Sequence, residues 1–362
     1  MIADRPAGTD AALESVAGQF ETGGAFLSAA PFGNGLIHRS YCVTVAGGAR
    51  FILQRINTHV FPRPIELMEN IDRVTAHLGG IAAAGGRRAL TLIPAADGRT
   101  FAVDPDGMYW RLFRYIEGTR TVERIESAAQ CFQVARAFGD FQRQLTLLPP
   151  PRLHDTILGF HDTPQRLARL EAAIAADTAQ RVRLAGPEID FVASRSSLAR
   201  VLLDAGMPER VTHNDTKINN VLLDEHTGEA VFVIDLDTVM PGLALYDFGD
   251  MVRTATCAAA EDERDLSRIH ARFDYFEALA RGYLDGAGAF LTRTERELLT
   301  GAGKLITFEQ GVRFLWDYLQ GDLYYPVSRE SHNLDRTRAQ FRLLESIEQQ
   351  ERPMDRLVRS LI

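Results

Sequence analysis

The residue pattern of the chain changes near residue 116, and this change constrains the fold more than any other feature. Before it, short β-rich runs alternate with Gly and Pro turns, and "SYCVTVAGGARFILQRIN" predicts two strands joined by a tight turn at Gly47 and Gly48. One helix, with Pro64 in its first turn, interrupts these strands. From residue 127 the apolar residues recur at helical spacing. We therefore expect an α+β fold with a β-rich N-terminal lobe and a larger, mainly helical C-terminal lobe.

The boundary between the lobes is expected at 1–116 and 117–362, with residues 114–118 as a connector. Further strands are predicted within 91–103 and 108–116, and the helical pattern covers 127–145, 164–176, 187–205, 263–284, 294–320 and 333–350. The segment 210–238 is the exception in the second half, because it predicts two short strands about a turn from Glu225 to Glu229.

Bulk properties exclude several classes of protein. A chain of 362 residues exceeds what one core supports, and 46% hydrophobic with 24% charged residues is typical of a globular protein. The net charge of -8 argues against nucleic acid as a partner. Cys42, Cys131 and Cys257 are far apart, which favours a reduced cytoplasmic setting. No signal peptide or long apolar run occurs, so we expect no membrane span, and no obligatory protein partner is inferred.

The stretch "HNDTKINN" carries the strongest chemical signal. Asp215 follows His213 by two residues and precedes Asn220 by five, and Asn220 leads into the predicted hairpin. Phosphoryl transfer from ATP needs a carboxylate near the attacking hydroxyl and oxygen ligands that hold Mg²⁺ against the phosphates. The far strand of the hairpin ends in "VIDLD", which supplies Asp235. The alternative is a polar turn with a core histidine and a carboxylate that ends a strand.

The literal string "DFG" at Asp247 is a competing position for the metal ligand. Asp247 follows "TVMPGLALY", which is a Pro/Gly turn, whereas Asp235 follows a run of largely apolar strand residues. We therefore assign the metal to Asp235 and expect Asp247 and Asp250 to cap the next helix or to brace the catalytic loop.

"HNDTKINN" followed by "VIDLD" resembles the catalytic core of the aminoglycoside phosphotransferase superfamily, which has a protein-kinase-like fold. The resemblance implies ATP and Mg²⁺ as cofactors and an N-terminal lobe that binds the nucleotide. It makes Asp215 the catalytic base or the carboxylate that orients the hydroxyl. Asn220 and Asp235 become metal ligands, with Asp237 as an additional one. Lys217 takes a charge-stabilising role, for which a solvated surface lysine is the alternative.

The nucleotide end departs from the kinase pattern. "FGNGLIH" resembles a phosphate-covering loop with Gly33 and Gly35, although a plain turn has the same pattern. Where kinases place a lysine, "FILQRIN" has Gln54 and Arg55, and strand alternation lets only one of them face ATP. The sequence leaves open what replaces the lysine. The partner carboxylate is expected from Glu66 or Glu69, with Glu69 assigned to the site, and Tyr115 is expected in the adenine-contacting connector.

Longer stretches, among them "FILQRINTHVFPRPIELMENI" and "GVRFLWDYLQGDLYYPV", resemble the N-acetylhexosamine 1-kinases of this superfamily. That resemblance implies phosphorylation of the anomeric hydroxyl of N-acetylglucosamine or N-acetylgalactosamine. It implies sugar contacts from His38, Asp215, Arg313 and Tyr324. Two alternatives stay open: a kinase of the same fold acting on an aminoglycoside, choline or another sugar, and a nucleotide-binding pseudoenzyme. A polycationic acceptor would need several carboxylates around its pocket.

Overall fold

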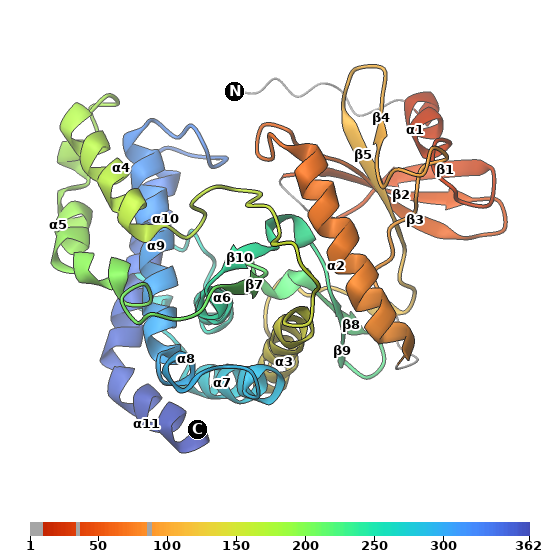
Figure 1. The fold of residues 1–362 in the computed structure, drawn as a ribbon. Coiled ribbons are helices and arrows are strands. Elements are labelled where there is room, and N and C mark those ends of the chain that lie inside the picture. Colours follow the sequence, from red (N-terminus) through yellow and green to blue (C-terminus); the bar gives the residue numbers. More distant parts are fainter. Residues whose placement is uncertain (1–9, 34–36, 85–88) are drawn as a thin grey trace.

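The computed structural model describes residues 10–33, 37–84 and 89–362, and Figure 1 shows a sheet at one end and helices at the other. The N-terminal part contains α1 (Asp10–Ala17), β1 (Phe26–Pro31), β2 (Arg39–Val45), β3 (Arg50–Arg55), α2 (Pro64–Ala84), β4 (Ala102–Val103) and β5 (Tyr109–Arg114). The C-terminal part contains β6 (Thr119–Arg120), α3 (Ala128–Leu145), α4 (Thr163–Ala176), α5 (Gly186–Ser194), β7 (Arg210–Thr212), β8 (Val221–Asp224), β9 (Ala230–Val233), β10 (Met240–Gly242), α6 (Ala244–Ala255), α7 (Phe273–Ala287), α8 (Arg293–Glu297), α9 (Leu299–Leu319), α10 (His332–Gln349) and α11 (Glu351–Leu361). The predicted α+β architecture is confirmed.

The N-terminal sheet is antiparallel in the order β1-β2-β3-β5-β4. Phe51 and Leu53 of β3 are fully buried in an apolar cluster that includes Leu13 of α1. Because successive side chains of a strand alternate between faces, Gln54 points to the opposite face of the sheet. Figure 1 shows α2 between this sheet and the C-terminal part. The face that carries Gln54 is therefore the one available to a functional site.

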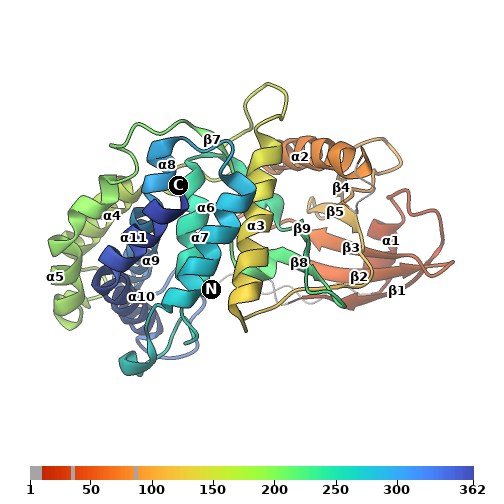
Figure 2. The same ribbon diagram turned by 90° about the horizontal axis from the view of Figure 1, so that it is seen from below.

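Helices α3 and α7 cross with their backbones in close contact, and Figure 2 shows them side by side. A Cβ atom at Gly139 would lie 2.8 Å from the carbonyl oxygen of Tyr283, and one at Gly286 would lie 2.6 Å from that of Arg136. Any side chain at these positions would push the helices apart. The close crossing fixes α3, whose inner face supports the segment around residue 213.

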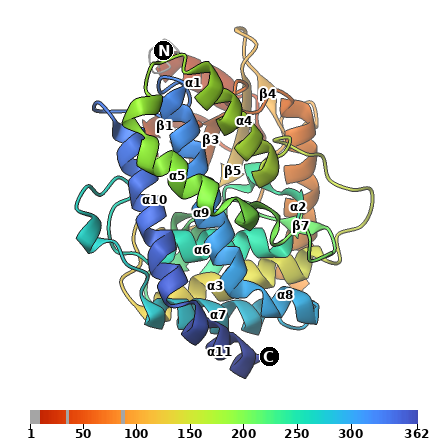
Figure 3. The same cartoon turned by 90° about the vertical axis from the view of Figure 1, so that its left-hand side faces the viewer.

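The outer helices form a separate layer. Figure 3 shows α4 and α5 in front of α9 and α10. Leu170 of α4 and Val192 of α5 pack in one apolar cluster with Leu315 of α9 and Phe341 of α10. Together these helices hold α9 against α6, and so place the middle of α9 next to the functional residues described below.

Several predicted elements differ from the structure. The expected strand at 91–103 is regular only at Ala102–Val103, and the expected helix at 187–205 ends at Ser194 and continues as a short 3-10 helix. The helix expected at 263–284 begins only at Phe273, and the one expected at 294–320 is divided at Leu298. Helices α1, α6 and α11 were not predicted. None of the helices in the described part of the chain is both long and apolar enough to span a membrane.

Candidate active site

The loop after β7 is fixed by His213, which is completely buried. Its ring lies edge-on to Phe138 and Phe141 of α3. Nε2 lies 2.9 Å from the carbonyl oxygen of Ile234, and Nδ1 lies 3.4 Å from the backbone nitrogen of Asp215. Nε2 must therefore carry the proton, because a carbonyl only accepts and the backbone N–H only donates. His213 thus joins the loop carrying Asp215 to the strand end that precedes Asp235.

Asp247 of the "DFG" string braces the same loop. Its carboxylate accepts the backbone N–H groups of His213 at 2.9 Å and Asn214 at 2.7 Å, and the side-chain amide of Gln142 at 2.6 Å. Burial raises the pKa of Asp247, and these three donors act in the opposite direction. Of the two roles expected for Asp247, bracing is confirmed. Capping is wrong, because α6 already begins at Ala244 with Leu243 at its N-cap position.

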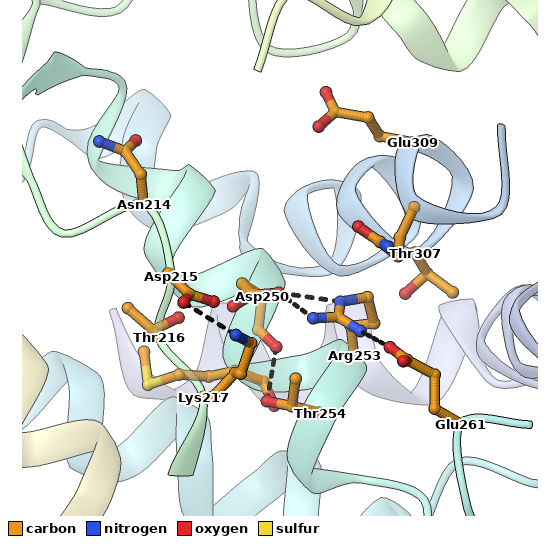
Figure 4. A network of polar contacts seen from close by, with 12 residues as sticks. Asn214, Asp215, Thr216, Lys217, Asp250, Arg253, Thr254, Glu261, Thr307 and Glu309 are labelled. Carbon is orange, nitrogen blue, oxygen red and sulfur yellow. Dashed lines mark hydrogen bonds and ion pairs between the residues drawn. The ribbon is translucent and has the colours of Figure 1, made fainter. Parts of the chain in front are cut away.

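Asp215 and Lys217 form an ion pair, with 2.9 Å between Nζ and Oδ2 (Figure 4). Burial would raise the pKa of Asp215, but the adjacent ammonium group outweighs burial and lowers it. Burial would likewise lower the pKa of Lys217, but the Asp215 carboxylate raises it. Asp215 is therefore ionised at neutral pH. In this state it can accept a hydrogen bond from a hydroxyl group.

A second ion pair lies beside the first. Arg253 binds Oδ1 of Asp250 through Nε at 2.8 Å and Nη2 at 2.7 Å, and its Nη1 binds Glu261 at 3.0 Å. Figure 4 shows Asp250 between Arg253 and the pair of Asp215 and Lys217. Oδ2 of Asp250 is buried, and none of the residues that the structure describes forms a hydrogen bond with it. One acceptor near Asp215 is thus available.

The two predicted metal ligands, Asn220 and Asp235, each carry an oxygen that can bind a cation. The side-chain amide nitrogen of Asn220 donates to the carbonyl oxygen of Asp215 at 2.8 Å, which leaves the amide oxygen of Asn220 as a free acceptor. Asp235 directly follows the strand end and adopts a left-handed backbone with φ 61°. Burial, together with the negative charges of Asp237 and Asp215, raises the pKa of Asp235 to about 6. A bound cation would relieve this concentration of negative charge.

No three His, Cys, Asp or Glu side chains converge as a complete metal site within the described ranges. Mg²⁺ in nucleotide-dependent enzymes is commonly held by one or two carboxylates while phosphates and water fill the other positions. The residues present therefore fit a nucleotide-bound magnesium ion, with Asn220 and Asp235 as the protein ligands. Their role stays a prediction.

Asp237 is engaged by the N-terminal sheet. The guanidinium group of Arg111 in β5 binds both its oxygens, with Nη1 to Oδ1 at 2.7 Å and Nη2 to Oδ2 at 2.6 Å. Nε2 of His38 lies 3.1 Å from Oδ1, at an angle outside hydrogen-bond geometry. Burial would raise the pKa of Asp237, but the Arg111 guanidinium holds it well below its usual range. A metal ion at Asp237 would compete with this ion pair.

The register of the sheet decides between Gln54 and Arg55. Gln54 pairs across strands with Ser40 and Arg111, so all three side chains share the face directed towards the C-terminal part. Gln54 donates to the hydroxyl of Ser40 at 2.9 Å and accepts from Nε of Arg111 at 2.9 Å. Arg55 alternates to the face of Phe51 and Leu53. Of the two residues, Gln54 is therefore the one on the face where the kinase lysine is expected.

The other residues predicted to bind nucleotide are placed as follows. Glu69 of α2 lies 2.7 Å from Nε2 of His154 through its carboxylate. Gly33 has φ 74°, and Gly35 lies outside the described residues. The ring of Tyr115 stacks under the guanidinium of Arg50 at 4.1 Å and meets Phe32 edge-on at 5.9 Å. The sheet and the connector thus bring Phe32 and Tyr115 together, whereas Glu69 lies elsewhere.

Of the predicted acceptor-binding residues in the C-terminal part, Tyr324 lies in a segment that a buried carboxylate holds in place. Asp317 of α9 accepts the backbone N–H groups of Leu323, Tyr324 and Tyr325 at 2.9, 2.8 and 2.9 Å. This leaves the ring of Tyr324 55% exposed, with one contact edge-on to Tyr325. Arg313 packs with its guanidinium over the rings of Phe160 and Tyr325. An exposed aromatic ring with a guanidinium group near it is suited to binding a sugar.

Sequence reasoning missed Glu309, which is 1% exposed and connects α9 to the catalytic loop. Its carboxylate accepts from Nδ1 of His161 at 2.9 Å and from the hydroxyl of Thr163 at 2.6 Å. Nε2 of the same histidine lies 3.2 Å from the carbonyl oxygen of Asn214. The ring of His161 thus bridges the Glu309 carboxylate and the backbone of the loop that carries Asp215. A Glu at the centre of an apolar helix was the available signal.

We expect Glu309 to make stability depend on pH. Burial would raise the pKa of Glu309, but His161 outweighs it and lowers the pKa to about 2. The contribution of a lowered carboxyl pKa is complete above the unfolded value, about 4.3, and is lost as the pH falls towards 2. The shift corresponds to about 3 kcal/mol. Melting temperatures of wild type and Glu309→Gln should differ most above about pH 5, and the difference should shrink as the pH falls from about 4 to 2. A difference that stays constant over this range would contradict the assignment.

The fold and the site agree with comparisons to known proteins. The model of the phosphotransferase enzyme family, APH, matches residues 28–288. The chain belongs to this family. It is therefore a phosphotransferase that acts on a hydroxyl group of a small molecule.

Solved structures share the fold at low sequence identity. A spectinomycin phosphotransferase in complex with ADP and spectinomycin has a TM-score of 0.58 at 12% identity, covering 99% of both chains. A microcompartment-associated aminopropanol kinase has a TM-score of 0.57 at 18% identity, covering 91% of this chain and 93% of its own. An amicoumacin kinase bound to AMP-PNP and Ca²⁺ has a TM-score of 0.58 at 14% identity, covering 87% of each. At such identities the likeness establishes the fold and not the acceptor.

Proposed function

We propose that this phosphotransferase uses ATP and Mg²⁺ to phosphorylate the anomeric C1 hydroxyl of an N-acetylhexosamine, N-acetylglucosamine or N-acetylgalactosamine, in a reducing cytoplasmic setting. Residues 1–116 would form the nucleotide lobe and 117–362 the catalytic lobe. The observation that carries the transfer chemistry is the arrangement around Asp215. Its ionised carboxylate lies next to Lys217, and its own backbone carbonyl orients the amide of Asn220.

Charge pairing supports a neutral acceptor over a polycationic one. The carboxylates near the loop are already matched by cations: Asp215 by Lys217, Asp250 by Arg253, and Glu309 by Arg166. Arg313 adds positive charge near Glu309. These cations would repel a polycationic antibiotic. The hydroxyl and acetamido groups of a sugar, in contrast, could form hydrogen bonds with both the cationic and the anionic side chains.

In the proposed reaction, Asp215 accepts the hydrogen bond of the C1 hydroxyl and orients its oxygen towards the γ-phosphorus. The new P–O bond forms as the bond to the ADP oxygen breaks, and the hydroxyl proton leaves towards Asp215. Lys217 offsets negative charge on the transferred group. A magnesium ion held by Asn220 and Asp235 would neutralise the phosphates. Arg313 and Tyr324 would bind the sugar, and Gly33 with Tyr115 would line the nucleotide.

The experiment that tests this function is a screen for ADP release with N-acetylhexosamines, other sugars, choline and aminoglycosides. We expect an N-acetylhexosamine to give the highest kcat/KM and a product whose phosphorus NMR signal is that of a sugar 1-phosphate. Phosphorylation of aminoglycosides alone, or at another hydroxyl, would overturn the proposed acceptor.

Variants of the sugar site give the matched control. Arg313→Met and Tyr324→Ala should each raise the KM for the sugar about 10-fold or more, because each removes one recognition contact. The KM for ATP should stay within about twofold. Leu323→Ala is a suitable control, because Leu323 is a neighbouring exposed side chain (78%) and its change should leave both KM values unaltered.

A further inference from the structure

An arginine inside the N-terminal sheet has no place in the roles assigned so far. Arg111 lies in the middle of β5 and is 1% exposed, among the largest side chains that are fully buried. A charged side chain is very rarely buried to this extent unless it is paired. Its Nε donates to Gln54, and its two terminal nitrogens donate to the two oxygens of Asp237. Arg111 therefore connects three segments that are far apart in the sequence.

The position of this contact is informative. Gln54 holds the register at which a kinase lysine is expected, and its amide cannot carry a positive charge. The residue opposite Gln54 on the neighbouring strand is Arg111. The sheet thus keeps a cation directly beside the vacant lysine position, but on β5. The carboxylate partner does not come from α2, where Glu69 binds His154, but from the turn after β9.

The turn that Arg111 holds is the one that carries Asp235. Asp237 lies two residues after Asp235 in a short 3-10 helix, Leu236–Thr238. Its backbone oxygen accepts from the hydroxyl of Thr156 at 2.8 Å. Asp235 itself has a left-handed backbone, which is strained for a residue with a Cβ atom and persists only where the surroundings hold it. The contact of the Asp237 side chain with Arg111 and that of its backbone oxygen with Thr156 supply this restraint.

We propose that the Arg111–Asp237 ion pair positions the metal-binding turn against the sheet, taking over the ordering role of the absent strand lysine, and that Asp237 is a positioning residue and not a metal ligand. The inference rests on the proposed phosphoryl-transfer function in one respect, namely that the turn carrying Asp235 binds the metal. The ion pair itself is a property of the folded chain. With 2% and 3% of their side chains exposed, neither Arg111 nor Asp237 reaches a nucleotide without breaking the pair.

If Asp237 is a metal ligand, its replacement should affect the stability of the metal-free and nucleotide-free protein differently than if it is a positioning residue. A metal ligand surrounded by other carboxylates is destabilising until the metal binds, so its removal leaves the metal-free protein as stable or more stable. Removing one member of a buried ion pair leaves an unpaired charge, which is strongly destabilising. Replacing both members removes this penalty, so the two changes are not additive.

The test measures melting temperatures of the metal-free and nucleotide-free protein. We expect Arg111→Met and Asp237→Asn each to lower the melting temperature by about 5–10 °C, and the double variant to lose clearly less than the sum. Arg99→Met is the matched control, because Arg99 pairs with Asp97 on the exposed surface of the same part, and it should change the melting temperature by about 1 °C or less.

A second measurement separates positioning from mere stability. Calorimetric binding of ATP at increasing Mg²⁺, without any acceptor, should require about 10-fold more Mg²⁺ in Arg111→Lys, which keeps the charge but not the two-pronged contact. The proposal is overturned if Asp237→Asn leaves the metal-free melting temperature unchanged and raises the Mg²⁺ requirement as much as Asp235→Asn does. Because neither readout needs an acceptor, a wrong sugar assignment would leave both results intact.

Discussion

Asp215→Asn is expected to keep the fold and to lower kcat by a factor of about 10² to 10⁴, which is the usual contribution of a positioned acid or base. The amide has the same shape but cannot accept the proton of the acceptor hydroxyl. It also removes the negative charge that Lys217 neutralises at 2.9 Å. The KM values should change far less than kcat, because the interaction lost is made chiefly in the transition state.

The variant to compare with Asp215→Asn is a change of its ion-pair partner, Lys217. Lys217→Met removes the other half of the ion pair, and its side chain is 48% exposed, so folding should be unaffected. If Lys217 stabilises the transferred phosphoryl group, kcat should fall about 10-fold or more, and a solvated lysine would give no change. Activity of Asp215→Asn within a few fold of wild type would exclude Asp215 as the residue that orients the hydroxyl.

The sequence predicted the parts of the fold that local patterns specify. The hairpin at Gly47 and Gly48 and the helix that Pro64 opens were predicted from turn residues and periodicity, and both are confirmed. Helix α6 was not predicted, because "ALYDFGDMVRTA" contains Gly249 and two aspartates that oppose an isolated helix. It forms because it is buried on nearly all sides between α9 and the catalytic loop. Tertiary packing here overrides local propensity.

The candidate site likewise has parts that the local sequence predicts and parts that depend on tertiary packing. The catalytic loop and the strand end at Asp235 are close in sequence, so their spacing carried the prediction. Arg111, in contrast, acts on Asp237 from 126 residues away. The only local sign was an arginine within "MYWRLFRY", where both neighbours are apolar. Its partner could not be inferred, because it depends on strand register and on how the two parts pack.

The choice between Asp235 and Asp247 as the metal ligand gives the second large effect. Asp235→Ala should leave the melting temperature close to that of wild type and raise the Mg²⁺ requirement for ADP release at least about 10-fold. The reason is electrostatic, since the pKa of Asp235 is raised to about 6 by burial and by the neighbouring carboxylates. Its charge is unfavourable in the metal-free protein and becomes favourable only beside a cation.

Asp247→Ala should behave in the opposite way. Asp247 is fully buried, and its loss leaves two backbone N–H groups and one of the two side-chain N–H groups of Gln142 without an acceptor, at a cost of about 3 kcal/mol or more. The melting temperature should fall by several degrees, and kcat should fall because the loop carrying Asp215 loses its support. The Mg²⁺ requirement of the protein that remains folded should change little. A larger rise in Mg²⁺ requirement for Asp247→Ala than for Asp235→Ala would move the metal to the "DFG" carboxylate, and the bracing contacts seen here would then have to break when the nucleotide binds.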